Sequence, residues 1–179
     1  MQIKLNQQLF ENFRHKYTTF NYEKYDLKIK NNSILCEFDF NIDNKYFFKP
    51  TFEIPERSFF NIKSIPDQLL NNIVFNIGMI ELISYWKATC SPKIIVKPFK
   101  LNNEQINFWK KIYFNGLGEF FYLNSITTNI DDFVDIMSDS KNETQKTDIL
   151  TENAIIVPIG GGKDSVVSLE LLKKLPYRI

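Results

Sequence analysis

Three consecutive glycines followed by a lysine, an aspartate and a serine, Gly160 to Ser165, are the residues best suited to perform chemistry. Glycine has no Cβ, so the backbone can approach an anion closely and adopt left-handed angles that point several N–H groups one way. The apolar run at residues 154–158 precedes the glycines, and apolar residues at helical spacing follow them. The pattern predicts a strand buried on both faces, a phosphate-binding loop, and a helix beginning near Asp164 whose N-terminus faces the phosphate.

The three polar side chains of this segment suit a nucleotide. Lys163 adds positive charge, and Ser165 adds a hydroxyl donor. Asp164 would repel a bare phosphate, but it can hold a divalent cation that accompanies a nucleotide. We therefore expect a nucleotide accompanied by a divalent cation as the ligand, with Asp164 contributing to the metal. The alternative is that a glycine-rich turn between a strand and a helix only permits close packing.

The spacing distinguishes among known phosphate-binding motifs. A Walker loop requires glycine at 157 and serine or threonine at 164, where this chain has valine and aspartate. The segment instead resembles the PP-loop signature Ser-Gly-Gly-x-Asp-Ser of the ATP pyrophosphatase superfamily, with Gly160 in place of the first serine. The positions that match this signature are Gly161, Gly162, Asp164 and Ser165. The resemblance implies that the loop holds the β and γ phosphates of ATP while an acceptor attacks the α phosphate, which releases pyrophosphate.

Two further segments, at residues 77–92 and 105–124, make the resemblance narrower. With PIGGGKDS and the following VVSLELL, they are similar to the bacterial UDP-N-acetyl-α-D-muramoyl-L-alanyl-L-glutamate epimerases, over most of residues 70–175. The resemblance implies a nucleotide-sugar dipeptide substrate of peptidoglycan synthesis, whose terminal L-Glu is activated as an acyl adenylate and inverted to D-Glu. It implies ATP and Mg²⁺, and no pyridoxal phosphate.

Two other kinds of protein stay open as alternatives. One is a different PP-loop adenylating enzyme, such as a ligase, an amidotransferase or a tRNA-modifying enzyme. The other is a nucleotide-binding module without catalysis of its own. The small number of arginines argues mildly against tRNA, because phosphate and guanine recognition usually draws on arginine.

Inversion at a carbon requires an acid and a base, and three residues are candidates. Cys90 follows a predicted helix and could carry a proton, although a small buried hydrophobe is the more common role of such a cysteine. Glu81 and Glu119 lie in apolar stretches, where each could be a base of raised pKa or a partner of Lys87 or Lys110. Cys36 is predicted to lie in the core.

Composition excludes several classes of protein. Lysine plus arginine number 22 against 21 acidic residues, so no charge excess attracts nucleic acid or an anionic membrane. Two cysteines and one histidine leave no disulfide framework and no ordinary zinc site. No apolar run is long enough to span a bilayer, and the N-terminus lacks the apolar region of a signal peptide. We therefore expect a cytoplasmic protein.

Upstream of the loop, the pattern of apolar residues predicts an α+β domain. Its expected elements are an opening helix within 1–20, a three-stranded antiparallel meander over 25–54, a core helix over 67–90 with Asp67 as N-cap, a strand over 94–99, and a helix over 103–115 that ends at Asn115-Gly116. Asp131 and Asp135 are expected to share a solvated helix face.

The same pattern predicts the domain organisation. We expect the α+β N-terminal domain at 1–137, a linker at 138–152, and at 153–179 the first β-loop-α unit of a PP-loop α/β domain of the adenine nucleotide alpha hydrolase-like type. One strand and one helix cannot bury a parallel sheet. We therefore expect a truncated chain that lacks the C-terminal part of its own protein and is inactive alone.

Overall fold

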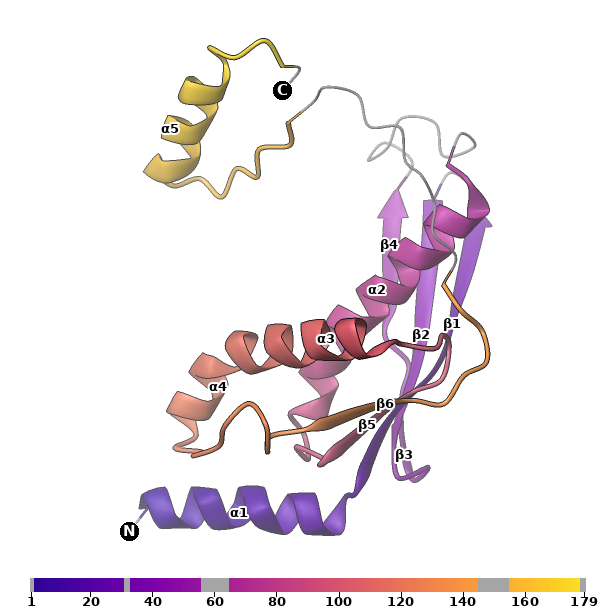
Figure 1. Ribbon diagram of the computed structural model, residues 1–179, viewed down its shortest axis with the longest axis vertical. Coiled ribbons are helices and arrows are strands. Elements are labelled where there is room, and N and C mark those ends of the chain that lie inside the picture. The colour runs from indigo at the N-terminus through magenta and orange to yellow at the C-terminus, as the bar shows by residue number, and fades with distance from the viewer. Residues whose placement is uncertain (1, 31–32, 56–64, 145–154, 178–179) are drawn as a thin grey trace. The chain divides into compact units, whose positions relative to one another are not determined.

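The structure, a computed structural model, describes residues 2–30, 33–55, 65–144 and 155–177. The chain divides into two compact units, residues 1–145 and 146–179. The first unit is an α+β fold with a mixed six-stranded sheet (Figure 1). Its elements are α1 (Gln2–Lys16), β1 (Thr19–Lys30), β2 (Ser33–Ile42), β3 (Tyr46–Phe48), β4 (Thr51–Pro55), α2 (Asp67–Trp86), β5 (Lys93–Val96), α3 (Asn103–Gly116), α4 (Gly118–Leu123) and β6 (Asp135–Ser138).

The predicted antiparallel meander is present, with two differences. Strands β3 and β4 both pair with β2, so the expected third strand consists of two pieces separated by Lys49 and Pro50. Strand β1 begins six residues earlier than expected, and its pairing with β2 shifts between Tyr22 and Lys24. The bulge at Glu23 shifts the alternation of inward and outward side chains by one position. The residues before and after the bulge therefore do not follow a single period of two, and the sequence pattern did not indicate the first half of the strand.

Strands β5 and β6 extend the sheet in parallel with β1, in the order β3-β2-β1-β5-β6. Strand β6 was not predicted from the sequence. Asp131 and Asp135 do not share a helix face, because Asp131 lies in a turn and Asp135 begins β6. The apolar Phe133 and Val134 between them are buried in the core, and they draw the chain back onto the sheet.

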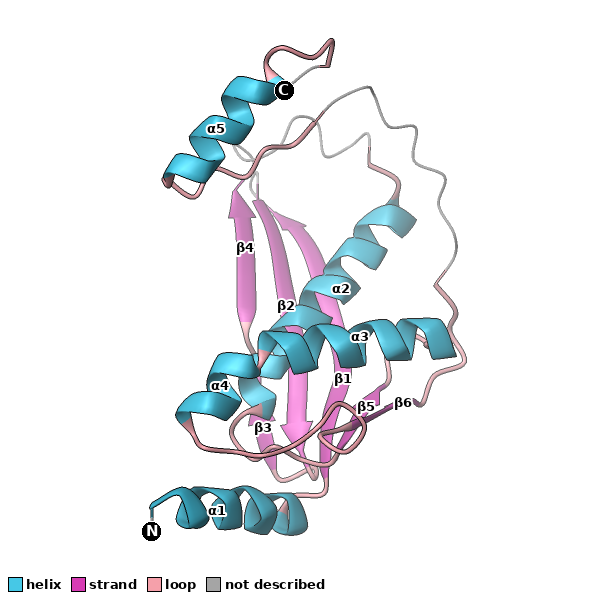
Figure 2. Ribbon diagram, turned by 60° about the vertical axis from the view of Figure 1, so that its left-hand side comes forward, coloured by secondary structure: helices cyan, strands magenta, loops and turns pink. Residues whose placement is uncertain are grey.

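Helix α2 packs across β1 and β2 and supplies the centre of the core (Figure 2). Its buried residues are Leu70, Val74, Phe75, Gly78, Met79, Leu82 and Trp86. Asp67 is the first helical residue rather than the N-cap, which is Pro66, and its side chain makes no capping hydrogen bond. The helix ends at Trp86, before the expected residue 90. Ile73 and Ile80 are exposed, so its apolar stripe is wider than its buried face.

Helix α3 begins with a capping box between Asn102 and Gln105, which satisfies two backbone N–H groups. Trp109 and Tyr113 are buried on its inward face, whereas Ile112 is 46% exposed. The predicted left-handed stop at Gly116 is wrong, because glycine φ is positive only at Gly161 among the described residues. The chain instead continues through Leu117 into α4.

Arg14 ties α1 to the rest of the first unit. Its Nη1 donates to the carbonyl oxygens of Cys90 at 2.9 Å and of Phe133 at 2.5 Å, and its Nη2 donates to that of Asp132 at 3.1 Å. The three acceptors belong to the chain just after α2 and just before β6. One planar guanidinium thereby joins three segments that are far apart in the sequence.

Substitution of Arg14 by alanine should lower the free energy of unfolding by about 2–3 kcal/mol, because three carbonyls lose a charged donor. Arg14→Lys should recover part of this loss, since lysine keeps the charge without the planar fork. The neighbouring His15 is exposed, so His15→Ala is the matched control and should change stability by less than about 0.5 kcal/mol. Urea unfolding measures the free energy of unfolding of the three variants. Equal losses of stability for Arg14→Ala and His15→Ala would contradict the prediction.

The second unit contains α5 (Lys163–Leu172), as predicted, and none of the residues of α5 is buried. The predicted strand at 154–158 is not formed at the described residues 155–158, and Ile156 is 92% exposed. A strand covered on both faces needs neighbouring strands to take its hydrogen bonds, and no described residue pairs with this segment. Residue 154 lies outside the described residues.

Candidate functional site

The glycine-rich loop enters α5 through a left-handed residue. Gly161 has a φ of +81°, and Gly162, the N-cap of α5, is extended with φ −88° and ψ 164°. Ser165 Oγ donates to the carbonyl oxygen of Gly162 at 2.9 Å, and no side chain caps the first turn of α5. The first amide groups of the helix are therefore open to an anion at its positive end.

The three glycines have no packing role among the described residues. A Cβ added at Gly160, Gly161 or Gly162 would meet no atom within 4 Å. This is the opposite of the alternative considered from the sequence, in which the glycines only permit close packing. The positive φ at position 161 explains why that residue is glycine, but backbone conformation does not explain glycine at positions 160 and 162. The space beside all three glycines leaves room for a ligand at the backbone.

The polar residues of the loop are accessible. Lys163 and Asp164 are exposed, and Ser165 is half-buried. These residues could hold a nucleotide by backbone N–H groups, one hydroxyl and one ammonium group, with the Asp164 carboxylate as an oxygen ligand for Mg²⁺. The described residues contain no group of three histidine, cysteine or acidic side chains that could hold a metal ion unaided. A metal here would depend on phosphate oxygens as further ligands.

Cys90 lies in the first unit and is 5% exposed. It follows α2 with a φ of 51°, and its thiol donates to the carbonyl oxygen of Lys87 at 3.7 Å. Burial raises the pKa of the Cys90 thiol to about 12, and the positive charge of Arg14 only partly opposes this rise. The thiol is therefore protonated at neutral pH, and in this state it can donate a proton but not accept one.

The raised pKa predicts slow modification of Cys90. At pH 8 the thiolate should be about a thousandfold rarer than in a free cysteine, so iodoacetamide should react correspondingly slowly until the protein is unfolded. The unfolded thiol ionises near pH 9, so the free energy of unfolding should fall as pH rises from about 9 towards 12. A Cys36→Ala variant isolates Cys90 for mass spectrometry; modification at the rate of a free thiol in the folded chain would contradict this.

The two glutamate candidates are placed apart from Cys90. Glu81 is half-buried on α2, and Glu119 is exposed on α4. Among the described residues no hydrogen bond or ion pair joins these three candidates. Lys110, considered as a glutamate partner, instead donates to the carbonyl oxygen of Asp131 at 2.9 Å and lies 3.9 Å from the Asp135 carboxylate. An acid/base role for Cys90, Glu81 or Glu119 stays a prediction.

Sequence reasoning missed a polar cluster on the sheet. Asn41, 1% exposed, accepts from Asn21 Nδ2 at 2.8 Å and donates to Glu23 Oε1 at 2.7 Å. Lys97 Nζ donates to both Glu23 carboxylate oxygens, at 2.7 and 2.8 Å. The signal in the sequence was the polar Asn41 between Phe40 and Ile42. The sequence did not indicate that its partner, Glu23, lies on the bulge of β1. Each polar atom in these hydrogen bonds has a partner, so the cluster suits a structural role.

The chain combines an α+β unit with a glycine-rich loop that leads into an exposed helix. Residues 11–178 match the family model of the MurL N-terminal domain, and the chain belongs to this family. This confirms the resemblance drawn from the sequence.

One curated relative is the UDP-N-acetyl-alpha-D-muramoyl-L-alanyl-L-glutamate epimerase of Xanthomonas oryzae pv. oryzae (strain MAFF 311018). The chain is 30% identical to it over 95 residues, which cover 53% of this chain and 21% of the relative. The match therefore spans about a fifth of the relative's length. No solved structure matches the chain. Among the described residues, none of the helices is long and apolar enough to cross a membrane.

Proposed function

We propose that this chain is the N-terminal part of an ATP-dependent epimerase that inverts the terminal L-Glu of UDP-MurNAc-L-Ala-L-Glu to D-Glu in peptidoglycan precursor synthesis. The observation that carries the proposal is the loop at 160–165, whose three glycines have no packing partner and stand at the open N-terminus of α5. The family of the chain and the epimerase name of its relative support the same reaction.

In this proposal the loop belongs to a PP-loop α/β domain. The backbone N–H groups of Gly160, Gly161 and Gly162 hold the β and γ phosphates of ATP, as the positive end of α5 favours. Lys163 neutralises phosphate charge, and the Ser165 hydroxyl is a further donor. The Asp164 carboxylate would hold a Mg²⁺ ion, which would supply positive charge beside the phosphates.

Adenylation explains why an epimerase would consume ATP. The α-proton of a glutamyl residue is a poor acid while its α-carboxylate is ionised. Attack of this carboxylate on the α phosphate of ATP forms an acyl adenylate and releases pyrophosphate, and the neutral acyl group makes the proton easier to remove. A base removes it from one face, an acid returns a proton to the other, and hydrolysis of the adenylate releases AMP.

The acid and base are assigned by what each group can do. Cys90 is protonated at neutral pH, so of the two roles it suits the acid that returns the proton. Glu81 and Glu119 carry carboxyl groups, which are ordinary general bases, and we propose one of them for the other face. A UDP-linked substrate and ATP both belong to the cytoplasm, which we propose as the compartment.

The test is deuterium incorporation at the glutamyl α-carbon of UDP-MurNAc-L-Ala-L-Glu in heavy water, measured by mass spectrometry on the full-length protein. We expect exchange only when ATP and Mg²⁺ are present, together with AMP and pyrophosphate. Absence of exchange from a folded preparation that binds ATP would refute the epimerase. ATP turnover dependent on tRNA or on ammonia would assign the protein to another class of PP-loop enzyme, and nucleotide binding without turnover would leave a binding module.

A further inference from the structure

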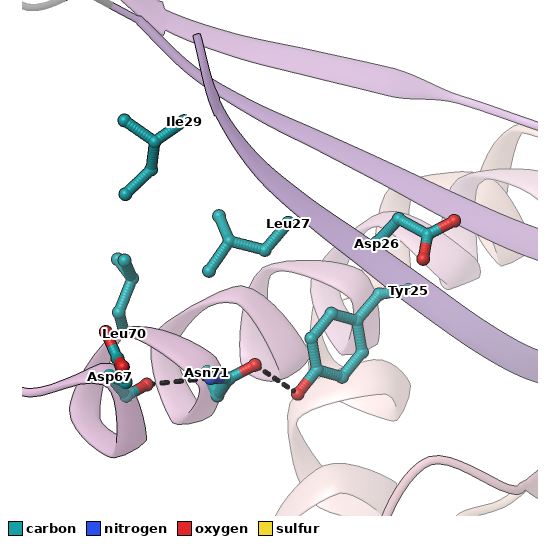
Figure 3. Close-up of a pocket in the computed structure, with 7 residues that line it drawn as sticks. All are labelled: Tyr25, Asp26, Leu27, Ile29, Asp67, Leu70 and Asn71. Carbon is teal, nitrogen blue, oxygen red and sulfur yellow. Dashed lines mark hydrogen bonds between the residues drawn. The ribbon is translucent and has the colours of Figure 1, made fainter.

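A hollow of about 490 Å³ lies between the second half of β1 and the first turns of α2, in the first unit. Figure 3 shows the side chains of Tyr25 and Leu27 on β1 extending towards Leu70 and Asn71 on α2. A second hollow of about 320 Å³ shares Tyr25 and Asn71 with the first, and it is also lined by Phe99 and Glu143. The larger hollow falls within the roughly 300–1,000 Å³ that small-molecule sites occupy.

The polar groups of the hollow are fixed in place but retain unused hydrogen-bonding capacity. Tyr25 donates its hydroxyl to Asn71 Oδ1 at 3.1 Å, and Asn71 Nδ2 donates to the carbonyl oxygen of Asp67 at 2.8 Å. The tyrosine oxygen can still accept, and the Asn71 amide keeps one N–H. The Asp67 carboxylate, exposed on the first turn of α2, adds two acceptor oxygens. Most of the hydrogen-bonding positions that remain are acceptors, so they suit a ligand that brings hydrogen-bond donors.

The apolar part of the wall is supplied by Leu27, Ile29 and Leu70. Tyr25 adds a half-buried ring, which packs at a centroid distance of 6.3 Å from Phe99. A ligand that fills the hollow must therefore present an apolar surface on one side and hydrogen-bond donors on the other. A pyranose ring has this character, because its C–H groups form one surface and its hydroxyls form the rim.

The charge of the hollow disfavours an anion. Asp67 already occupies the position at the N-terminus of α2 where negative charge is favoured. Asp26 is the second carboxylate of this wall and lies 3.6 Å from Lys24 Nζ, and Glu143, which lines the second hollow, forms an ion pair with Lys100 at 3.0 Å. A phosphate or a carboxylate placed here would be repelled by the Asp67 carboxylate, whereas neutral hydroxyls would not be repelled.

We infer that the hollow around Tyr25 and Asn71 is a carbohydrate-binding site that takes a neutral pyranose ring carrying an N-acetyl group. The choice of this sugar rests on the proposed function, in which the substrate contains a muramoyl ring. The binding itself needs neither ATP nor turnover. A failure of α-proton exchange in the full-length protein therefore leaves this inference standing, and the absence of sugar binding leaves the proposed function standing.

The test uses the 179-residue chain labelled with ¹⁵N, titrated with methyl N-acetyl-α-D-glucosaminide as the probe. Saturable shifts of the Tyr25, Leu27 and Asn71 amide signals are expected. Asp67→Asn should weaken binding about tenfold, because hydroxyls lose a charged acceptor. Glu104→Gln is the matched control, since Glu104 is also an exposed acidic residue in the first turn of a helix, α3, and it should leave binding unchanged.

Three outcomes would overturn the inference. One is the absence of saturable shifts at these amides in a chain whose spectrum is dispersed and therefore folded. Another is a response to methylammonium or to inorganic phosphate that equals or exceeds the response to the sugar, because the hollow would then recognise charge. The third is equal weakening by Asp67→Asn and Glu104→Gln, which would show that the shifts report a general effect of surface charge.

Discussion

Gly161→Ala in the full-length protein is expected to lower ATP-dependent deuterium exchange at least about a hundredfold, while the free energy of unfolding changes by about 1 kcal/mol or less. The φ of Gly161 is +81°, where an alanine is strained, so the loop would change shape to relieve it. The added Cβ meets no protein atom, and the protein core is therefore unaffected. The exchange rate falls because phosphate binding is weakened when the N–H groups of the loop no longer point at one position.

Two further variants separate the roles of the loop. Asp164→Asn should abolish most of the exchange and raise the Mg²⁺ concentration needed for what remains, because the amide is a poorer ligand for the metal than the carboxylate. Ser168→Ala, one turn along α5 and also exposed, is the matched control and should retain full activity. Measured exchange rates and urea unfolding separate activity from stability. Full activity of Gly161→Ala would contradict the assignment of the loop as the phosphate site.

The fold was predictable where one period of apolar residues held along a whole element. Strand β2 alternates between half-buried and buried residues from Ser33 to Phe40, and Phe38 and Phe40 lie in the core. Strand β1 was only half found because the bulge at Glu23 changes the phase of the alternation. In α2 the sequence offers more apolar residues than the sheet can cover, so the pattern alone could not distinguish buried Val74 from exposed Ile73.

The site was predictable where chemistry resides in contiguous residues and unpredictable where it depends on contacts across the fold. The loop at 160–165 was recognised from its spacing, and the left-handed conformation expected of its glycines is present at Gly161. Arg14 gave no local signal, because its three acceptors are carbonyl groups 76 to 119 residues away. The hollow around Tyr25 arises only when β1 and α2 meet, so no window of sequence contains it.

Gly78→Ala is expected to lower the free energy of unfolding by about 2 kcal/mol, the largest stability effect we expect from the addition of a single methyl group. Gly78 lies on the buried face of α2, where a Cβ would overlap the Tyr22 hydroxyl and stand 2.8 Å from Phe38 Cδ1. Both rings are fully buried and cannot move aside without opening the core. Overpacking of this kind costs about 1–3 kcal/mol, and because of the severe overlap it exceeds the gain of up to ~1 kcal/mol that alanine brings to a helix.

Tyr22→Phe tests the same contact from the other side. The Tyr22 hydroxyl is buried and has no hydrogen-bond partner among the described residues, so its removal should raise the free energy of unfolding by about 1 kcal/mol. In the Tyr22→Phe background, Gly78→Ala should cost less than in the wild type, because the oxygen nearest the new Cβ is gone. Gly116→Ala, where a Cβ meets nothing, is the control and should be neutral or stabilise by ~0.5 kcal/mol. Equal costs of Gly78→Ala in both backgrounds, measured by urea unfolding, would show that the clash lies elsewhere.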